Sequence, residues 1–405
     1  MKKLLLVLLM YQSAAVAQKD TSLKKPVEPA VAKPRPKWYE TISLRGYMQV
    51  RYNRLLETNS ELQCEQCDRS WGGNGGLFIR RARLVFFGQL HERLYFYFQP
   101  DFATAVSGTN QNFAQIRDAY VDLGIDRKNE YRIRIGQSKI PYGFENMQSS
   151  QNRLPLDRAD ALNSSIANER DLGAMFYWAP QETRKLFSSL VSEGLKGSGD
   201  YGVVGFGVFN GQTNNKPEQN KNLHVVGRVT YPMELGRQLI EPSIQAYTGK
   251  YFITKDQLSP GTKIKTGNNY DDQRIAGSFV LYPKPFGIQA EYNWGKGPEF
   301  NTATDSIETR PLSGGYATFS YLLRAKEQVI IPFVRVQTYT GGKKHELDAR
   351  SYDMDELEFG LEWQPFRNFE LVTMYTLSRR RFEDFGKQDN FQEGRLLRLQ
   401  VQVNF

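Results

Sequence analysis

Arginine residues recur at alternate positions in several stretches of the chain. Arg81 and Arg83 form one such pair, and Arg132 and Arg134 form another. Residues two apart on a β-strand share a face, and guanidinium groups stay charged and offer fixed forks of donors to oxyanions. A wall of such groups can bind a phosphate-like solute weakly at successive points and pass it on. The candidate pore-lining and anion-binding residues are Arg45, Arg51, Arg81, Arg83, Arg132, Arg134 and Arg228.

Acidic residues limit this interpretation. Glu356, Glu358 and Glu362 take alternate positions on a later stretch, with apolar residues between them. Any polar lumen carries acids and bases in compensating pairs. The formal net charge of +9 comes mostly from the first 37 residues. An anion preference therefore depends on where the arginines lie rather than on the net charge.

The C-terminal stretch, Arg395 to Phe405, alternates without a break. Such a strand has one face for an apolar phase and one for water. A final strand that ends on a free aromatic residue is typical of bacterial outer-membrane barrels, so we expect Phe405 to contact the barrel-assembly machinery. An edge strand of a soluble β protein is the alternative. The apolar face comprises Leu397, Leu399, Val401, Val403 and Phe405, and the polar face comprises Arg398, Gln400, Gln402 and Asn404.

The N-terminal region differs in composition from the rest. Lys2 and Lys3 precede the apolar run Leu4 to Met10 and the small residues Ala15-Val16-Ala17, a pattern that predicts a signal peptide over residues 1–17. The following segment is rich in Pro, Lys and Ala, and we predict a periplasmic linker over residues 18–40. The remaining residues, 41–405, are the predicted membrane domain.

Alternating runs bounded by turn residues predict about sixteen strands. A transmembrane helix needs about 18 consecutive apolar residues, and no stretch outside the signal peptide approaches this. A membrane protein of this composition therefore crosses the bilayer as a barrel. The predicted strands run near 42–53, 77–89, 94–102, 115–124, 131–140, 171–179, 201–210, 222–231, 239–249, 272–282, 287–294, 314–323, 328–339, 353–363, 369–378 and 395–405.

The links between these strands fix the orientation. Every second link is mostly short, as from Leu90 to Arg93, and the others are long and polar. Short periplasmic turns and long external loops are typical of outer-membrane barrels. The link from Ala179 to Asp200 is long for a turn, and an additional hairpin is one explanation. We predict an all-β fold, a transmembrane antiparallel β-barrel of about 16 strands with an aqueous lumen.

Motifs along this chain resemble, in order, those of the phosphate-selective porins of the O and P type. The resemblance covers nearly all of residues 40–405, and the order of the motifs is more specific than any one of them. The motifs are RRARLVFFG at 80–88, QIRDAYV at 115–121, IGQSKIPYG at 135–143, ERDLGAM at 169–175, VFNG at 208–211, VGRV at 226–229 and GLEWQP at 360–365.

The resemblance implies a homotrimeric porin in the Gram-negative outer membrane, in contact with its lipid, that passes small anionic solutes. In this family an infolded external loop builds a constriction where basic residues trap anions. The matching loop here is roughly Tyr142 to Arg170, and its basic residues are Arg153, Arg158 and Arg170. No lysine cluster matches the binding site of the family, and Lys139 has the lipid-facing parity of its strand.

The two cysteines, Cys64 and Cys67, lie in the first external loop. An oxidising compartment favours a small local disulfide between them. The sequence predicts no metal site, no cofactor and no nucleic-acid binding, because the ligands and basic runs that these need are missing. Of three histidines only His224 lies within a predicted strand, so we predict that the protein is not an enzyme.

Two non-porin functions remain open. The barrel can be a non-conducting structural or adhesion protein whose long loops do the work. It can also be a component of an uptake complex in which a partner supplies specificity. A plugged transporter is excluded, because it needs about 22 strands and an N-terminal plug domain.

Overall fold

Alternation of apolar and polar residues gives the chain its strands. The computed structural model describes residues 37–64, 76–103 and 113–405. The strands are β1 (Ile42–Leu55), β2 (Leu77–His91), β3 (Leu94–Ala103), β4 (Phe113–Gly124), β5 (Tyr131–Lys139), β6 (Arg170–Trp178), β7 (Val204–Phe209), β8 (His224–Thr230), β9 (Met233–Leu235), β10 (Gln238–Phe252), β11 (Asn269–Leu281), β12 (Phe286–Asn301), β13 (Ser306–Tyr321), β14 (Leu323–Ala325), β15 (Gln328–Gly342), β16 (Ser351–Phe366), β17 (Phe369–Glu383) and β18 (Phe391–Asn404).

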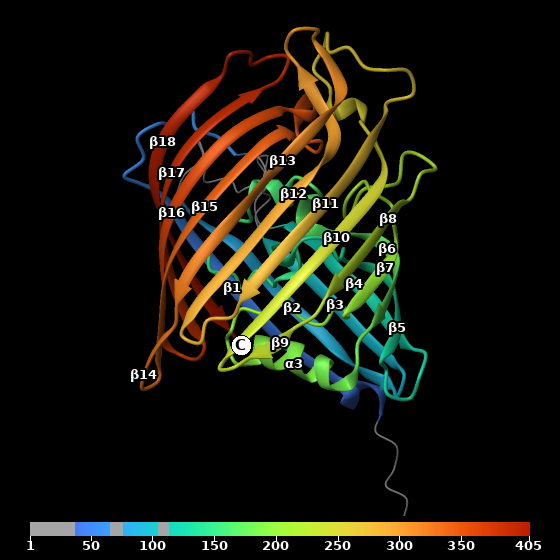
Figure 1. Ribbon diagram of the computed structural model, residues 1–405, viewed down its shortest axis with the longest axis vertical. Coiled ribbons are helices and arrows are strands. Elements are labelled where there is room, and N and C mark those ends of the chain that lie inside the picture. The colour runs from blue at the N-terminus through green and yellow to red at the C-terminus, as the bar shows by residue number, and fades with distance from the viewer. Residues whose placement is uncertain (1–36, 65–75, 104–112) are drawn as a thin grey trace, which may run out of the picture. The chain divides into compact units, whose positions relative to one another are not determined.

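The strands form one antiparallel sheet that closes on itself, because β1 pairs with β2 on one side and with β18 on the other (Figure 1). The eighteen labelled strands fill sixteen strand positions, or staves, around the wall. This is because β8 and β9 share one position beside β10, and β13 and β14 share one position beside β15. The predicted sixteen-stranded barrel is confirmed. The largest difference from the predicted ranges is the hairpin of β12 and β13, which extends to Asn301 and Ser306.

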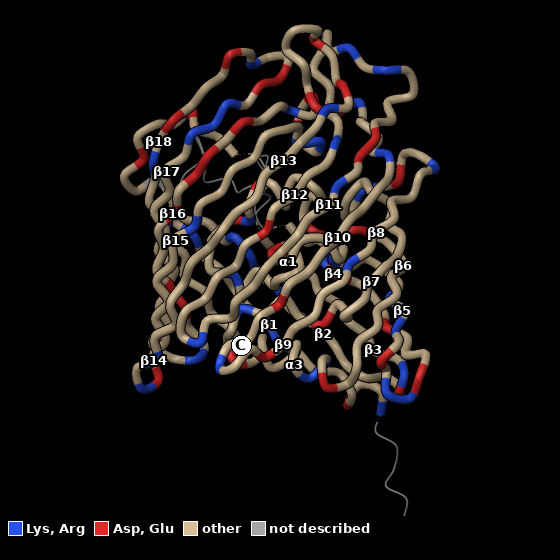
Figure 2. The backbone as a smooth tube through the Cα atoms, in the orientation of Figure 1, with Lys and Arg blue, Asp and Glu red and all other residues tan. Residues whose placement is uncertain are grey.

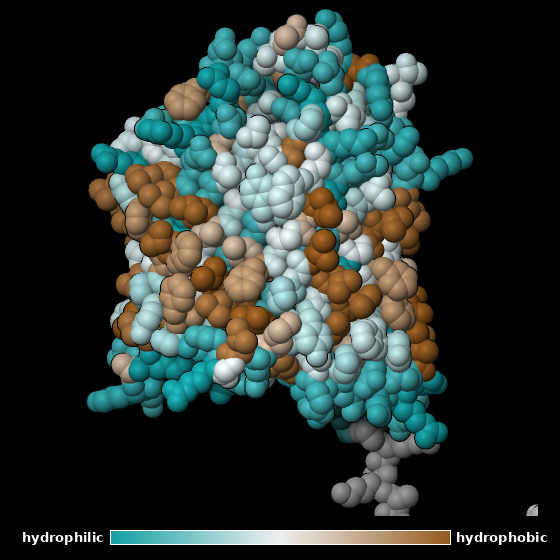
Figure 3. Space-filling view, viewed as in Figure 1, coloured by the Kyte–Doolittle hydropathy of each residue, from teal (hydrophilic) through white to brown (hydrophobic). Residues whose placement is uncertain are grey.

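The two faces of the wall follow the predicted period of two. On β18, Arg398 and Gln402 are 0% and 1% exposed and point inward. On the face seen in Figure 3, hydrophobic residues form a band across the middle of the barrel, with hydrophilic zones above and below it. Lys, Arg, Asp and Glu gather at both ends of the strands and inside the barrel (Figure 2). This distribution matches a wall with lipid outside and polar groups inside.

The chain end lies at the barrel end that carries the short turns. Phe405 exchanges backbone hydrogen bonds with Gly46 of β1, with N···O distances of 2.7 and 3.0 Å. A Cβ atom placed on Gly46 would lie 2.6 Å from the Phe405 ring. The terminal aromatic residue therefore packs over a position where only glycine leaves room.

The link between β6 and β7 holds a helix, α3 (Gln181–Ser192), and not the hairpin that its length suggested. Leu186, Phe187 and Leu190 have helical spacing, and the last two are buried. A period of two is missing here, so the segment has no face that a strand could bury. The helices among the described residues are all too short or too polar to cross a bilayer.

A short 3-10 helix, η1 (Trp38–Thr41), leads into β1. Residues 1–36 lie outside the described residues, so the signal peptide (1–17) and the linker (18–40) stay predictions. Two further 3-10 turns, η3 (Lys255–Gln257) and η4 (Leu347–Ala349), lie in external loops and contact each other.

Candidate functional site

The loop between β5 and β6, residues 140–169, is buried inside the barrel along most of its length. It contains α1 (Phe144–Met147), α2 (Asp160–Asn163) and η2 (Ala167–Glu169). Tyr142, Leu162 and Ile166 join a buried apolar cluster with wall residues that include Tyr247 and Tyr339. The loop therefore occupies the lumen as the family resemblance implied.

Carboxylates of this loop bind arginines of the wall. Glu145 accepts from Arg335 on β15 at 3.0 Å. Asp157 accepts from Arg51 on β1 at 3.2 Å and also pairs with Arg398 on β18. A buried ion pair needs good geometry and further hydrogen bonds to offset desolvation, and Arg51 has them, since it also donates to Gln400. These arginines hold the loop in place.

Asp160, at the start of α2, provides a second attachment. Its Oδ2 lies 2.8 Å from Nζ of Lys343 and 3.0 Å from Nη1 of Arg380 on β17. Burial raises the pKa of Asp160, but Lys343 and Arg380 outweigh burial and hold this pKa below its usual value. Burial likewise opposes ionisation of Asp157, yet Arg398 and Arg51 keep its pKa well below the usual range. Both carboxylates are therefore ionised at neutral pH.

Most of the predicted pore-lining arginines lie inside the barrel beside a carboxylate. The pairs and their N···O distances are Arg83 with Asp101 at 2.8 Å, Arg132 with Asp200 at 2.7 Å, Arg134 with Asp122 at 2.7 Å and Arg228 with Glu241 at 2.9 Å. Arg45 differs, because it is exposed and lies over the Phe87 ring, 5.5 Å from its centroid. Ion pairing reduces the charge that such a residue presents to a solute.

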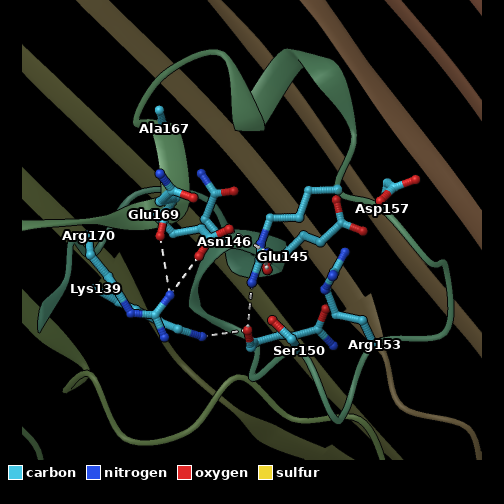
Figure 4. Close-up of polar contacts among 12 residues, drawn as sticks. Lys139, Glu145, Asn146, Ser150, Arg153, Asp157, Ala167, Glu169 and Arg170 are labelled. Carbon is cyan, nitrogen blue, oxygen red and sulfur yellow. Dashed lines mark hydrogen bonds and ion pairs between the residues drawn. The ribbon is translucent and has the colours of Figure 1, made fainter. Parts of the chain in front are cut away.

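The three basic residues predicted for the constriction differ in their surroundings, and Figure 4 labels two of them, Arg153 and Arg170. Arg158 pairs with Glu169, and Arg170 lies 2.7 Å from Glu169 and 2.9 Å from Asp118. Burial raises the pKa of Glu169, but Arg158 and Arg170 hold it well below its usual value. Arg153 donates one long bond of 3.4 Å to the Leu156 carbonyl.

Arg81 and Arg153 are two buried arginines whose surroundings differ from those of the paired arginines. Within the described residues neither forms an ion pair, although their side chains are 3% and 4% exposed. Arg81 donates to Gln49 at 2.8 Å, and the charges of Arg81 and Arg153 repel each other. Burial and the neighbouring Arg158 lower the pKa of Arg153 to about 9. Two like charges held in low-dielectric surroundings favour an anion near them.

The parity prediction for Lys139 was wrong. Its side chain is buried, and Nζ donates to the carbonyls of Met147 and Gln148 at 2.8 and 2.5 Å. Gly136, with a φ of +127°, interrupts the alternation of β5 and lets Lys139 turn inward. The ammonium group binds carbonyls at the end of α1, where such acceptors lack partners.

The predicted acidic stripe, made of Glu356, Glu358 and Glu362 on β16, is paired with basic residues. Glu356 lies 2.6 Å from Arg380, Glu358 lies 2.8 Å from Arg335, and Glu362 lies 2.6 Å from Lys196. Every carboxylate of the stripe thus has a basic partner. This balance removes the main sequence-level argument against an anion preference.

Other anchors were missing from the predicted set. Arg274 on β11 donates to Ser164 of the loop at 2.8 Å, and Arg380 binds Asp160 as described above. Both have inward parity on their strands, so the alternation contains the signal for them. Lys343 and Lys344 lie in a long external link, where no period indicates direction.

Cys64 is 3% exposed and packs with Leu62 and Leu396. Cys67 lies outside the described residues, so the Cys64 to Cys67 disulfide stays a prediction. Within the described ranges no group of three or more His, Cys, Asp or Glu side chains is placed to hold a metal ion.

Solved structures with the same fold are outer-membrane proteins. The outer-membrane channel DcaP of Acinetobacter baumannii has a TM-score of 0.54 at 12% identity, over 90% of this chain and 97% of that one. The anion-selective porin from Comamonas acidovorans has a TM-score of 0.54 at 10% identity, over 90% and 99%. OmpT of Vibrio cholerae, in its trimer form, has a TM-score of 0.50 at 9% identity, over 90% and 99%.

Among proteins with curated descriptions, none matches this chain in sequence. A family model described as phosphate-selective porin O and P matches residues 63–405. The closed barrel, the infolded loop and this match agree on a channel of the Gram-negative outer membrane rather than an enzyme. The chain belongs to the phosphate-selective porin O and P family.

Proposed function

We propose that this outer-membrane channel is a water-filled pore for passive diffusion of small solutes that prefers anions, phosphate-like oxyanions among them. Two observations carry the proposal: Arg81 and Arg153 form no ion pair within the described residues, and the carboxylates of Glu356, Glu358 and Glu362 are all paired. Guanidinium forks bind oxyanions through two parallel hydrogen bonds. The similar fold of the anion-selective Comamonas porin supports this proposal.

The test is the reversal potential of the purified protein in a planar bilayer with a salt gradient. An anion-preferring pore gives a reversal potential of the sign expected when anions carry most of the current. This preference declines at high ionic strength because salt screens the charges of the wall. Inorganic phosphate should reduce the chloride current if the guanidinium groups bind oxyanions. A reversal potential on the cation side contradicts the anion preference and leaves the channel itself intact.

We also propose that the protein is a homotrimer, that the assembly machinery recognises Phe405, and that the predicted arginines act as the pore lining. The trimer form of the similar OmpT supports the first point. The family and fold favour a channel over a non-conducting structural barrel or a partner-dependent uptake component. Cross-linking of the protein in outer membranes measures its subunit number.

A further inference from the structure

The segment between β6 and β7 lies across the periplasmic mouth of the barrel. It begins beside β5 and β6, where the Ala179 N–H donates to the Glu130 carbonyl at 3.0 Å. It reaches β16, where Lys196 Nζ binds both carboxylate oxygens of Glu362 at 2.6 and 2.7 Å. With sixteen staves in the wall, β16 stands eight staves from β6. The segment therefore connects opposite sides of the barrel. In Figure 1 its helix, α3, lies at the lower end of the barrel.

Local sequence explains this path. Gly194, with a φ of +74°, ends α3, and the Leu195 N–H donates back to the Leu190 carbonyl at 3.1 Å. This C-terminal motif turns the chain sharply inward. Leu190 and Leu195 then pack against Phe144 and Leu154 of the infolded loop and against inward side chains of β10 to β17. Lys196 is buried as well, with 8% exposure.

Little space remains between this segment and the infolded loop on that side. The cavity bounded by Leu154, Leu195, Lys196 and the β11 to β13 wall measures about 20 Å³. A water molecule needs about 10–15 Å³ of such volume, so this gap holds one water at most. Beside Glu193 and Leu195 the same segment borders an opening of about 530 Å³ against the turns at 283–285 and 322–324, and toward β3 to β5 it borders one of about 240 Å³. The charged residues that line the second opening are Arg93, Arg132, Arg134, Arg184, Asp122 and Asp200.

We propose that residues 179–200 form a periplasmic cap that covers part of the exit and narrows it on the β10 to β17 side. The inference rests on the proposed pore function and adds the element that limits the size of the exit. The buried ion pair of Lys196 and Glu362 attaches the part of the cap that is farthest from β5 and β6 to the wall at β16. At the other side Asp200 bridges Arg132 of the wall and Arg184 of the cap, at 2.7 and 2.8 Å.

Charge reversal at Lys196, which attaches the cap to Glu362 of β16, tests the inference. Lys196→Glu places a carboxylate against Glu362 and Glu370, and repulsion should release the cap. Because about half of the exit opens, we expect single-channel conductance to rise about twofold. The charge swap Lys196→Glu with Glu362→Lys should restore the wild-type value. The matched control is Lys185→Glu in α3, because Lys185 pairs with Glu182 on the solvent-exposed surface of the helix.

A second variant keeps the test decisive if charge reversal impairs assembly. Replacing residues 183–197 by a short Gly-Ser linker removes the cap and leaves every wall strand intact. It should also raise the conductance about twofold, because the same half of the exit opens. A cysteine at Leu239 of the wall should react with a periplasmic thiol reagent only when the cap is released or removed. Unchanged conductance and an unreactive cysteine overturn the inference, whereas a wild-type protein that does not conduct contradicts the proposed function instead.

Discussion

Arg51 of β1 donates from Nη1 to Oδ1 of Asp157 in the infolded loop, over 3.2 Å. The sequence places Arg51 on an inward face, and the structure gives that position a mechanical role. Asp157 also pairs with Arg398 of β18, the strand that pairs with β1 and closes the barrel. One carboxylate thus attaches the infolded loop to β1 and β18, the two strands whose pairing closes the barrel.

Asp157→Asn should loosen the constriction loop. The substitution removes the carboxylate charge that Arg51 and Arg398 share, and removing one partner of a buried ion pair costs about 3–5 kcal/mol. We expect larger current fluctuations in single-channel records and a lower temperature for loss of the folded, heat-modifiable form. The control is Asp389→Asn, whose carboxylate is solvent-exposed. Quiet channels from the Asp157 variant would show that the other attachments suffice.

Replacing Arg81 and Arg153 together with Gln should shift the reversal potential toward cations. Neither residue forms an ion pair within the described residues, although Glu145, Glu169 and Asp157 act on Arg153 from beyond ion-pair distance. The matched control removes the paired Arg83 and Asp101 as Gln and Asn, which leaves the net charge unchanged. Phosphate block should weaken in the first variant and persist in the second, because guanidinium forks bind the oxyanion. Equal reversal potentials in both variants contradict the assignment of the anion site.

Deleting Phe405, or replacing it with Lys, should block assembly, because the apolar terminus anchors the last strand at the interface. The structure adds that Gly46→Val should impair assembly too, since a Cβ there meets the Phe405 ring at 2.6 Å. Gly227→Ala is the control, because a Cβ at that position meets no atom within 4 Å. Heat-modifiable migration of outer-membrane fractions measures the folded yield. Normal yield from the truncated chain refutes the role of Phe405.

Cys64 and Cys67 should resist alkylation until they are reduced. Changing both to Ser should leave assembly nearly intact, because so short a closed ring constrains little chain entropy. Mass spectrometry of the alkylated protein counts the free thiols. Two modified cysteines in the unreduced protein would exclude the disulfide.

Acid should release the loop only at low pH. The pKa values of Asp157, Asp160 and Glu169 are all lowered in the folded protein by neighbouring cations, against the opposing effect of burial. The stability that they contribute is therefore present above their unfolded pKa values, about 4, and is lost as the pH falls through the folded values. These three carboxylates contribute no difference in thermal stability between pH 7 and pH 5, and we expect a decline below about pH 4 as they become protonated. A decline that begins above pH 5 contradicts this account.

The sequence by itself determined the barrel. Period-two alternation has one interpretation where one face meets lipid and the other meets polar groups, because a shift by one residue would exchange the two faces. The sixteen staves, the direction of the chain and the inward parity of Arg51, Arg81 and Arg398 follow from this pattern. It failed at Lys139, where Gly136 interrupts the strand geometry, and it held no signal for the lysines of the external link.

Only the tertiary structure decided what the inward residues do. Parity gives the face of a residue but not its partner across the lumen, because the partners come from loops that have no period. Arg335 therefore binds Glu145, and Glu362 binds Lys196, through contacts between segments 190 and 166 residues apart. Arg81 and Arg153 form no ion pair among the described residues for the same reason. Charge compensation in three dimensions determines which arginines are available to a solute.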